Sequence, residues 1–405
     1  MIRENYDLII IGGGSVGLAA AHYASREGKT ALVLERFDFF NDKGASSGAE
    51  RQFRIQYNEK EISQLVLDSI PLWQELEKLS GNQLLKTAGC VWFGNPKITG
   101  AEGQIEAVTR VMQELDVPYE ELQRDEIERK YHFKDLPDVY SGFFQKDGAA
   151  INVRATMKAL HDLACASGRV TMKGRQEILA IESRQNGVIV KTRDGAYSGS
   201  KLIVTAGPYV NDVLRLLDFE LNLVIWEMVG AYFKQQDTSI DYPTWISFDE
   251  KSGDDPMLYY GFPATGWAHP GYVHVGANYP VRTYRDTASY TRVPDARTLG
   301  QIANWVRSHM KGLDPEPVFP STGICALATE EGNDLVLRRE LIMDFAPDIV
   351  PYNENIVVCA SGWAYKVVPL LGKICADLAI RGYTRHDLSK MTLSADVMAE
   401  CLTAA

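Results

Sequence analysis

The sequence has no run of lysine or arginine, no cysteine pair in CxxC spacing, and no uncharged apolar stretch of about 18 residues, which a membrane-spanning helix needs. Its formal net charge of −11 argues against a nucleic-acid surface, and it has no basic run to attract an anionic membrane. The six cysteines are scattered, which suits a reducing compartment and does not match a zinc cage. These absences favour a cytoplasmic enzyme that binds neither nucleic acid, nor membrane, nor a metal ion.

The chain also lacks internal repeats, low-complexity tracts and linkers. Its 405 residues are too many for one ordinary core, so we expect two domains or one large α/β domain with an insert. Hydrophobic residues make up 45% and charged residues 23%, as in ordinary globular proteins. Without linkers, the domains should be interleaved and rigidly joined.

A glycine-rich turn follows the first apolar run, in "YDLIIIGGGSVGLAAAHYASREGKTALVLER". The run Leu8–Ile11 predicts a buried parallel strand. Gly12, Gly14 and Gly17 then follow in GxGxxG spacing. Such glycines allow a tight turn, a close backbone approach to a pyrophosphate, and close packing of helix on strand. The consecutive glycines also distinguish this run from a signal peptide.

The residues after the glycines complete the pattern. A helix is predicted over residues 15–26, and its N–H groups and dipole would face phosphates. A second strand over 31–34 ends at Glu35, an acid suited to a ribose 2′-hydroxyl. An acid here disfavours a 2′-phosphate, so the pattern predicts FAD or NAD.

A later segment favours FAD over NAD. An alternating strand over 188–192, a turn at Asp194 and Gly195, and a buried strand over 202–205 lead into Ala206 and Gly207. In two-domain flavoproteins, the second visit of the chain to the FAD domain ends in this kind of small-residue turn beneath the dinucleotide.

Longer motifs point to a family. "GASSGAERQFRIQY" (44–57), "CVWFG" (90–94), "AEGQI" (101–105) and "SGWAYKVVPLLGKICADLA" (361–379) make the chain resemble the monomeric sarcosine oxidase family of FAD amine oxidases. Within that family it is most similar to the piperideine-2-carboxylate oxidase branch. The resemblance implies an α/β fold in which a Rossmann-type, glutathione-reductase-like FAD domain is interleaved with a mostly antiparallel-sheet substrate domain.

The expected domain boundaries follow from this architecture. The FAD domain would take residues 1–88, 150–222 and 322–405, and the substrate domain residues 89–149 and 223–321. Within the latter, "MLYYGFPATGWAHPGYVHVGANYPV" predicts two strands joined by a Gly/Pro-rich turn. "DARTLGQIANWVRSHM" predicts an amphipathic helix begun by Asp295.

The resemblance implies that Arg54 and Lys366 clamp the substrate carboxylate and that Arg51 lies over the flavin. A guanidinium offers a planar fork to a carboxylate, and an ammonium adds a second positive charge. The alternatives are an ion pair of Arg54 with Glu50 one turn earlier, a Lys366 that extends to the surface, and an Arg51 that is a plain surface residue.

Four further residues stand at pocket positions of the family. Tyr260 would hydrogen-bond the substrate or fill the wall, Trp363 would pack on a cyclic substrate or lie in the core, and Glu102 would enter the pocket or stay solvated. Asn278 replaces an aspartate or a histidine and cannot act as a base, which favours plain two-electron oxidation.

Two more departures concern oxygen and the flavin linkage. His274 takes the place of the family's oxygen-activating lysine, where a protonated ring would stabilise superoxide or the histidine would serve only its strand. Gly323 stands at the family's attachment cysteine, with Cys325 two residues later. We therefore expect non-covalent FAD, with Cys325 as the attachment if one exists. The expected cofactor-binding residues are Gly12, Gly14, Gly17, Glu35, Arg36, Ser47, Arg51, Ala206, Gly207, Cys325, Gly362 and Lys366.

The sequence thus predicts an FAD-dependent oxidase of a small secondary amino acid that yields an imine and hydrogen peroxide. Sarcosine, pipecolate or proline, a piperideine carboxylate and iminodiacetate are the expected substrates, with dioxygen as the acceptor. We expect a monomer or small homo-oligomer. The alternatives are a dehydrogenase that passes electrons to a quinone or carrier, and a non-catalytic FAD-binding subunit.

Overall fold

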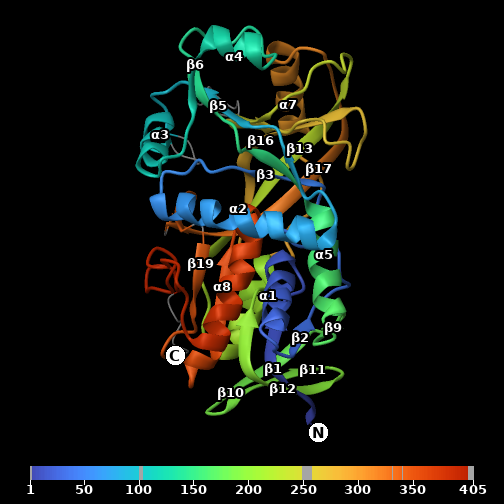
Figure 1. Cartoon of the computed structure of the whole chain (residues 1–405), viewed down its shortest axis with the longest axis vertical. Coiled ribbons are helices and arrows are strands. Elements are labelled where there is room, and N and C mark those ends of the chain that lie inside the picture. Colours follow the sequence, from blue (N-terminus) through green and yellow to red (C-terminus); the bar gives the residue numbers. More distant parts are fainter. Residues whose placement is uncertain (1, 100–103, 249–257, 331, 340, 400–405) are drawn as a thin grey trace.

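The computed structural model describes residues 2–99, 104–248, 258–330, 332–339 and 341–399. Two large sheets lie at opposite ends of an elongated molecule, and the long helix α2 (Lys60–Ser80) crosses between them (Figure 1). Within these residues, no helix is both long and apolar enough to cross a membrane.

The first sheet has eight strands built around parallel pairs. Its strands are β10 (Ile178–Arg184), β11 (Gly187–Thr192), β12 (Gly195–Val204), β1 (Ile2–Ile11), β2 (Ala31–Leu34), β9 (Val170–Lys173), β20 (Ile356–Ser361) and β19 (Leu341–Phe345). β1 pairs in parallel with both β12 and β2, and β20 adds to β12, also in parallel. The C-terminal end of β1, Leu8–Ile11, is wholly apolar and buried because helices or loops cover both faces of such a sheet.

Helices cover this sheet on two sides. α1 (Ser15–Arg26), α5 (Val153–Ala166) and α8 (Val368–Arg381) pack into one apolar core. α6 (Val210–Leu214) packs on the other face, between the short 3₁₀ turns η1 (Gly207–Tyr209) and η2 (Arg215–Leu217). The sheet is therefore the middle layer of a three-layer α/β unit.

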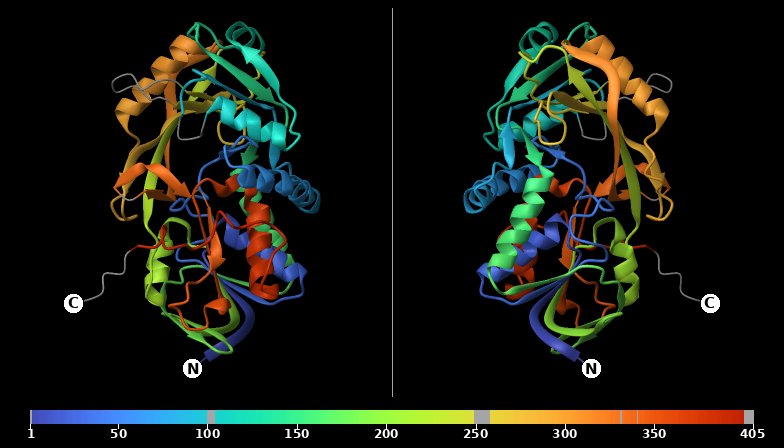
Figure 2. Two further views of the ribbon diagram at one scale, coloured as in Figure 1. Left: turned by 90° about the vertical axis from the view of Figure 1, so that its left-hand side faces the viewer. Right: turned by 90° about the vertical axis from the view of Figure 1, so that its right-hand side faces the viewer.

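The second sheet has nine strands and is antiparallel except where β14 meets β5. In order it contains β18 (Asn333–Arg339), β17 (Leu313–Glu330), β13 (Leu223–Gln235), β16 (Tyr272–Tyr284), β15 (Leu258–Gly261), β14 (Thr244–Phe248), β5 (Cys90–Gly94), β7 (Ser141–Gln145) and β6 (Glu120–Gln123). α3 (Ile105–Glu114), α4 (Arg124–Lys130) and α7 (Ala296–His309) accompany it. Figure 2 shows β13 and β17 as long strands that reach down from this sheet toward the first one.

A small three-stranded sheet joins the two halves. It consists of β3 (Glu50–Phe53), β8 (Ala149–Asn152) and β4 (Leu85–Thr87). Two more 3₁₀ turns, η3 (Asn353–Asn355) and η4 (Ala364–Val367), flank β20. β3 and η4 bring the predicted clamp residues to the same region.

Several local predictions are confirmed. α1 and β2 have the predicted bounds, and Asp295 caps α7 by accepting a hydrogen bond from the Thr298 N–H at 2.8 Å. The mostly antiparallel second sheet is also present. The predicted boundary between residues 321 and 322, however, falls inside β17, which continues in the nine-stranded sheet to Glu330.

Candidate active site

A cavity of about 960 Å³ is lined by residues of both large sheets and of the loops between them, near the top of the ~300–1,000 Å³ range of ligand pockets. Most residues predicted for the site line it: Gly12, Gly14, Glu35, Arg36, Ser47, Arg51, Arg54, Ala206, Gly207, Tyr260, His274, Cys325, Gly362, Trp363 and Lys366. Gly17 lies behind the wall. Glu102 and the side chain of Asn278 lie outside the described residues.

The glycine turn forms one end of the cavity. Gly12 has φ +107°, and a Cβ there would lie 2.5 Å from the carbonyl oxygen of Thr205. A Cβ on Gly17 would overlap the carbonyl oxygen of Gly12, so this glycine lets α1 pack against the turn. Gly14 is the N-cap of α1, and the first turn of α1, whose N–H groups have no partner within the helix, lines the cavity.

Glu35 stands at the end of β2 beside this turn. Its carboxylate accepts hydrogen bonds from the Gly13 N–H at 2.7 Å and the Phe37 N–H at 2.9 Å. Burial raises the pKa of Glu35, and these two N–H donors oppose the rise. Arg36 is half-exposed and pairs with Asp212 at 2.6 Å. This end of the cavity thus offers backbone donors, one acid and one cation.

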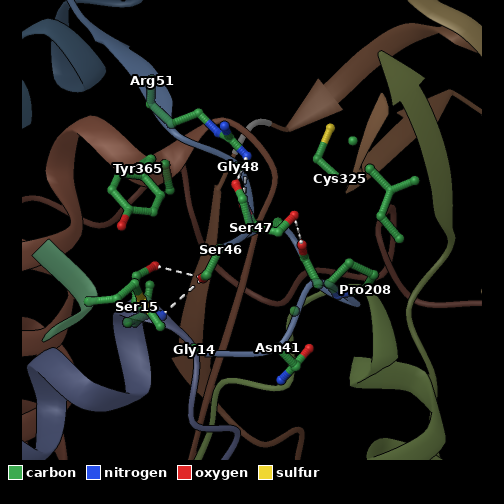
Figure 3. A pocket seen from close by; sticks show the side chains of 18 of the residues that line it. Gly14, Ser15, Asn41, Ser46, Ser47, Gly48, Arg51, Pro208, Cys325 and Tyr365 are labelled. Atoms are coloured by element: carbon green, nitrogen blue, oxygen red, sulfur yellow. Dashed lines mark hydrogen bonds between the residues drawn. The ribbon is translucent and has the colours of Figure 1, made fainter. Parts of the chain in front are cut away.

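A serine that sequence reasoning missed ties the next loop to α1. The Ser15 N–H donates to Ser46 Oγ at 3.0 Å, and the two hydroxyl oxygens are 3.1 Å apart (Figure 3). In the same loop, Arg51 donates to the carbonyl oxygens of Ala45 at 2.9 Å and Ser47 at 2.8 Å. Figure 3 shows the Arg51 guanidinium directed at this loop. Arg51 therefore organises the cavity wall and is not a plain surface residue.

The predicted clamp residues are buried at the other end of the cavity. Arg54 is 2% exposed and Lys366 is 6% exposed, so Lys366 does not extend to the surface. Arg54 donates to the carbonyl oxygen of Gln56, and its guanidinium lies 4.3 Å from the ring centre of Tyr57. Lys366 donates its ammonium to the Tyr57 hydroxyl. Two buried cations therefore meet on one phenol ring, which sequence reasoning missed.

The alternative ion pair of Arg54 with Glu50 is wrong. It assumed a helical turn, whereas residues 50–53 form β3, in which residues four apart are separated by roughly 13 Å. The Glu50 carboxylate instead lies 3.3 Å from His274 Nδ1 and accepts hydrogen bonds from Tyr232 at 3.2 Å and from Thr265. His274 thus has a charged partner within the cavity wall.

Aromatic side chains form another wall. Tyr260 lies in β15, and burial raises the pKa of its hydroxyl to about 12, so the phenol is neutral. Trp363 packs edge-to-face on Trp226, with ring centres 5.6 Å apart. Gly362 precedes Trp363, and a Cβ on Gly362 would collide with Leu327 of β17. Only glycine therefore lets the chain before η4 approach β17 this closely.

Cys325 lies in β17 beside Trp363. Burial raises the pKa of its thiol to about 12. The charge of Arg51 and a hydrogen bond with Trp363 lower this pKa, but burial has the larger effect. Gly323, two residues earlier, also lines the cavity, and no heavy atom lies within 4 Å of a Cβ built there. The family's attachment position is thus open space in this chain, and the nearby thiol is protonated.

Comparison with known families gives one match over most of the chain. The family described as "DAO: FAD dependent oxidoreductase" matches residues 7–378. Monomeric sarcosine oxidase of Bacillus sp. (strain B-0618) is 26% identical over 412 residues, which cover 99% of each chain. N-methyl-L-tryptophan oxidase of Yersinia pestis (strain Pestoides F) is 27% identical over 96% of this chain and 99% of its own. A longer Dictyostelium discoideum protein is 28% identical, but this chain spans only 37% of it.

Among solved structures, the open form of NikD, described as an unusual amino acid oxidase essential for nikkomycin biosynthesis, is similar. It has a TM-score of 0.88 and 36% identity over 96% of this chain and 98% of its own. L-proline dehydrogenase from P. horikoshii has a TM-score of 0.76 at 15% identity, which shows the fold alone. These matches confirm the predicted resemblance and fold class.

Proposed function

Because the chain belongs to the family of FAD dependent oxidoreductases, we propose that it is an oxidase of a small secondary amino acid that yields an imine and hydrogen peroxide. The single observation that carries this proposal is the pair of buried cations, Arg54 and Lys366, at the inner end of a cavity whose other end fits a dinucleotide.

The residues of the outer end fit FAD. The pyrophosphate would lie against Gly12–Gly14 and the N-terminus of α1, where a side chain on Gly12 would clash and backbone N–H groups point outward. Glu35 would accept a hydrogen bond from the ribose. Ser47, Arg51 and Lys366 line the same cavity, so the rest of the cofactor would extend past them toward the buried cations.

The chain's own residues bind and orient the substrate. Arg54 supplies two parallel N–H donors for a carboxylate and Lys366 a third, which fixes the acid end of the amino acid. Fixing that end leaves little freedom for the Cα–H and the amine, which lowers the entropic part of the barrier. Tyr260 and Trp363 would wall the substrate off from water. When bound, FAD supplies the two-electron chemistry between the amine and dioxygen.

The names of relatives support a secondary amino acid as the substrate. Sarcosine oxidase and N-methyl-L-tryptophan oxidase match nearly end to end, and the amino acid oxidase NikD matches at 36% identity. Sarcosine, pipecolate or proline, a piperideine carboxylate and iminodiacetate remain the proposed candidates. We also propose that FAD is held non-covalently and that the enzyme is a cytoplasmic monomer or small homo-oligomer.

The test is anaerobic flavin bleaching by a panel of amino acids: sarcosine, L- and D-proline, L-pipecolate, piperideine-2-carboxylate, iminodiacetate and primary amino acids. We expect rapid bleaching by one secondary amino acid, followed by peroxide release when air is admitted. Arg54→Lys keeps the charge but loses the planar fork, so it should weaken the response about 10- to 100-fold. Arg193→Lys, at an arginine whose side chain is 77% exposed, is the control. Bleaching by primary amino acids alone would refute the secondary-amine assignment.

A further inference from the structure

The buried carboxylate of Glu50 is aimed at the cavity wall. Glu50 is 3% exposed, yet it has three partners on other elements: His274 of β16, Tyr232 of β13 and Thr265. Burial by itself raises the pKa of Glu50, but His274, Thr265 and Tyr232 together lower it below the ordinary value. Glu50 is therefore an anion inside the protein.

The imidazole of His274 is held in a fixed plane. Tyr232 stacks on one side with ring centres 4.6 Å apart at 11°, and Phe262 stacks at 5.1 Å and 8°. His274 and Tyr232 are directly opposite one another in the β13–β16 ladder, which sets this stack. With Nδ1 turned to Glu50, the ring cannot tilt without breaking both stacks.

The other ring nitrogen faces the space left by a glycine. A Cβ on Gly230 would lie only 2.6 Å from His274 Nε2, and Gly230 itself lines the cavity. Any larger residue there would push the ring away. Both ring nitrogens are therefore buried, one beside the Glu50 carboxylate and the other against Gly230, while the His274 side chain as a whole lines the cavity.

Other charged and titratable groups surround the pair of Glu50 and His274. Burial and Glu50 raise the pKa of Tyr232, while the charges of Arg154 and Arg51 lower it, so the phenol keeps its proton and donates a hydrogen bond to Glu50. His269 packs edge-on against Tyr232 at 4.5 Å.

We propose that Glu50 is a positioning residue that fixes the His274 ring on the cavity wall, where the ring stabilises the anion formed as dioxygen is reduced. This inference rests on the proposed oxidase function. Over the whole reaction, dioxygen gains the two electrons and two protons that the amine loses, which gives hydrogen peroxide. Glu50 neither gains nor loses atoms in it, because its role is to set the position and plane of the ring.

The chain contains a matched control. Glu227 is also buried in this region and also accepts from a tyrosine (Tyr284, 2.6 Å) and a threonine (Thr322, 3.0 Å), with Arg282 as its cation at 3.5 Å. Glu227 has no histidine partner among the described residues, so Glu227→Gln reproduces the structural cost of losing a buried carboxylate charge.

The experiment separates the two half-reactions in the holoenzyme. In Glu50→Gln, the rate of anaerobic flavin reduction by the amine should stay within about twofold of the wild-type rate. The rate of flavin reoxidation by dioxygen should fall about 10- to 100-fold. Glu227→Gln should change neither rate. Unchanged reoxidation in Glu50→Gln would overturn the inference, whereas failure of every amine to reduce the wild-type flavin would overturn the proposed function instead.

Two further measurements guard against a merely structural effect. His274→Gln should slow reoxidation as well, and the double variant with Glu50→Gln should be no slower than His274→Gln alone, because Glu50 acts through the ring. Additive losses would contradict this. Nitrogen-15 NMR of the histidine rings, assigned with His274→Gln, should show that Glu50→Gln shifts the signals of the His274 ring. An unchanged spectrum would refute the link even without turnover.

Discussion

Lys366 donates its ammonium to the hydroxyl of Tyr57, a residue 309 positions earlier, while the same ammonium lies 4.7 Å from the centre of that ring. The guanidinium of Arg54 lies 4.3 Å from the same ring centre. A face of π-electrons stabilises both cations without cancelling their charge, as a carboxylate would. Tyr57 therefore gives the two cations a shared neutral neighbour.

Replacing Tyr57 by phenylalanine should weaken the clamp. The ring and its cation contacts remain, but Lys366 loses the hydrogen bond to the Tyr57 hydroxyl, which is worth about 1.5–3 kcal/mol for a charged donor. We expect the Kd of carboxylate inhibitors, measured by flavin difference spectra, to rise about 10-fold or more. Tyr242→Phe removes an equally buried hydroxyl that donates to the Lys311 carbonyl oxygen at 2.6 Å, away from the cavity, and should leave this Kd unchanged. Equal Kd values in both variants would contradict the role of Tyr57.

Gly17→Ala should release the cofactor. The new Cβ would overlap the Gly12 carbonyl oxygen and come 2.7 Å from Thr205 Oγ1, so α1 must move away from the turn. We expect a lower ratio of flavin to protein absorbance in the purified variant. Gly300→Ala is the matched control because no heavy atom lies within 4 Å of its Cβ. It should retain FAD and gain up to about 1 kcal/mol from helix propensity. Full flavin content in Gly17→Ala would refute the assignment.

The flavin should leave the protein on acid denaturation. With a thiol pKa raised to about 12, Cys325 is almost never the thiolate that nucleophilic attachment requires. We expect yellow supernatant and no fluorescent protein band, in wild type and in Cys325→Ser alike. Gly323→Cys places a thiol in open space at the family's attachment position and should retain some flavin on the band. A wild-type band that loses its fluorescence in Cys325→Ser would show that attachment does occur.

His22 should make the fold sensitive to mild acid. Burial lowers the pKa of His22 from 6.5 to about 4, and the charge of Arg26 adds to this. Below pH 6.5 the unfolded chain takes up a proton that the folded chain refuses until pH 4, so stability present above pH 6.5 is lost as the pH falls through this window. A gap of about 2.5 pH units corresponds to roughly 3 kcal/mol.

Urea denaturation of the wild type and His22→Leu at pH 7.5 and pH 5 checks this. The leucine variant cannot titrate at this position, so its free energy of unfolding should fall less between the two pH values. The comparison isolates His22 because every other titrating group is common to both proteins. An equal fall in both proteins would mean that His22 is protonated without cost.

The dinucleotide end was predictable because its signals are local. A strand, glycine turn, helix, second strand and acid follow one another within "YDLIIIGGGSVGLAAAHYASREGKTALVLER", and each residue type is required by the turn it occupies. α1 and β2 accordingly have the predicted bounds. Ser46 escaped because its partner, the Ser15 N–H, is brought near by tertiary folding.

The substrate end was predictable only through family resemblance. Alternation along a strand would put Arg54 and Tyr57 on opposite faces, but β3 ends at Phe53 and the chain turns, so both side chains meet. Glu50 was matched with Arg54 because the strand was not recognised. Its true partner, His274, comes from β16, and no sequence period links the two.

The pairing of Lys366 with Tyr57 also has a consequence for biosynthesis. The glycine turn and Gly207 are translated early, but α8, which packs on α1, and the clamp residue Lys366 come near the far end of the chain. The parallel pairing of β20 onto β12 is likewise a late event, since β20 is translated long after its neighbour. Non-local pairings of this kind form slowly. Both ends of the cavity therefore depend on the last elements to be translated, and redox activity is withheld until the protein is nearly finished.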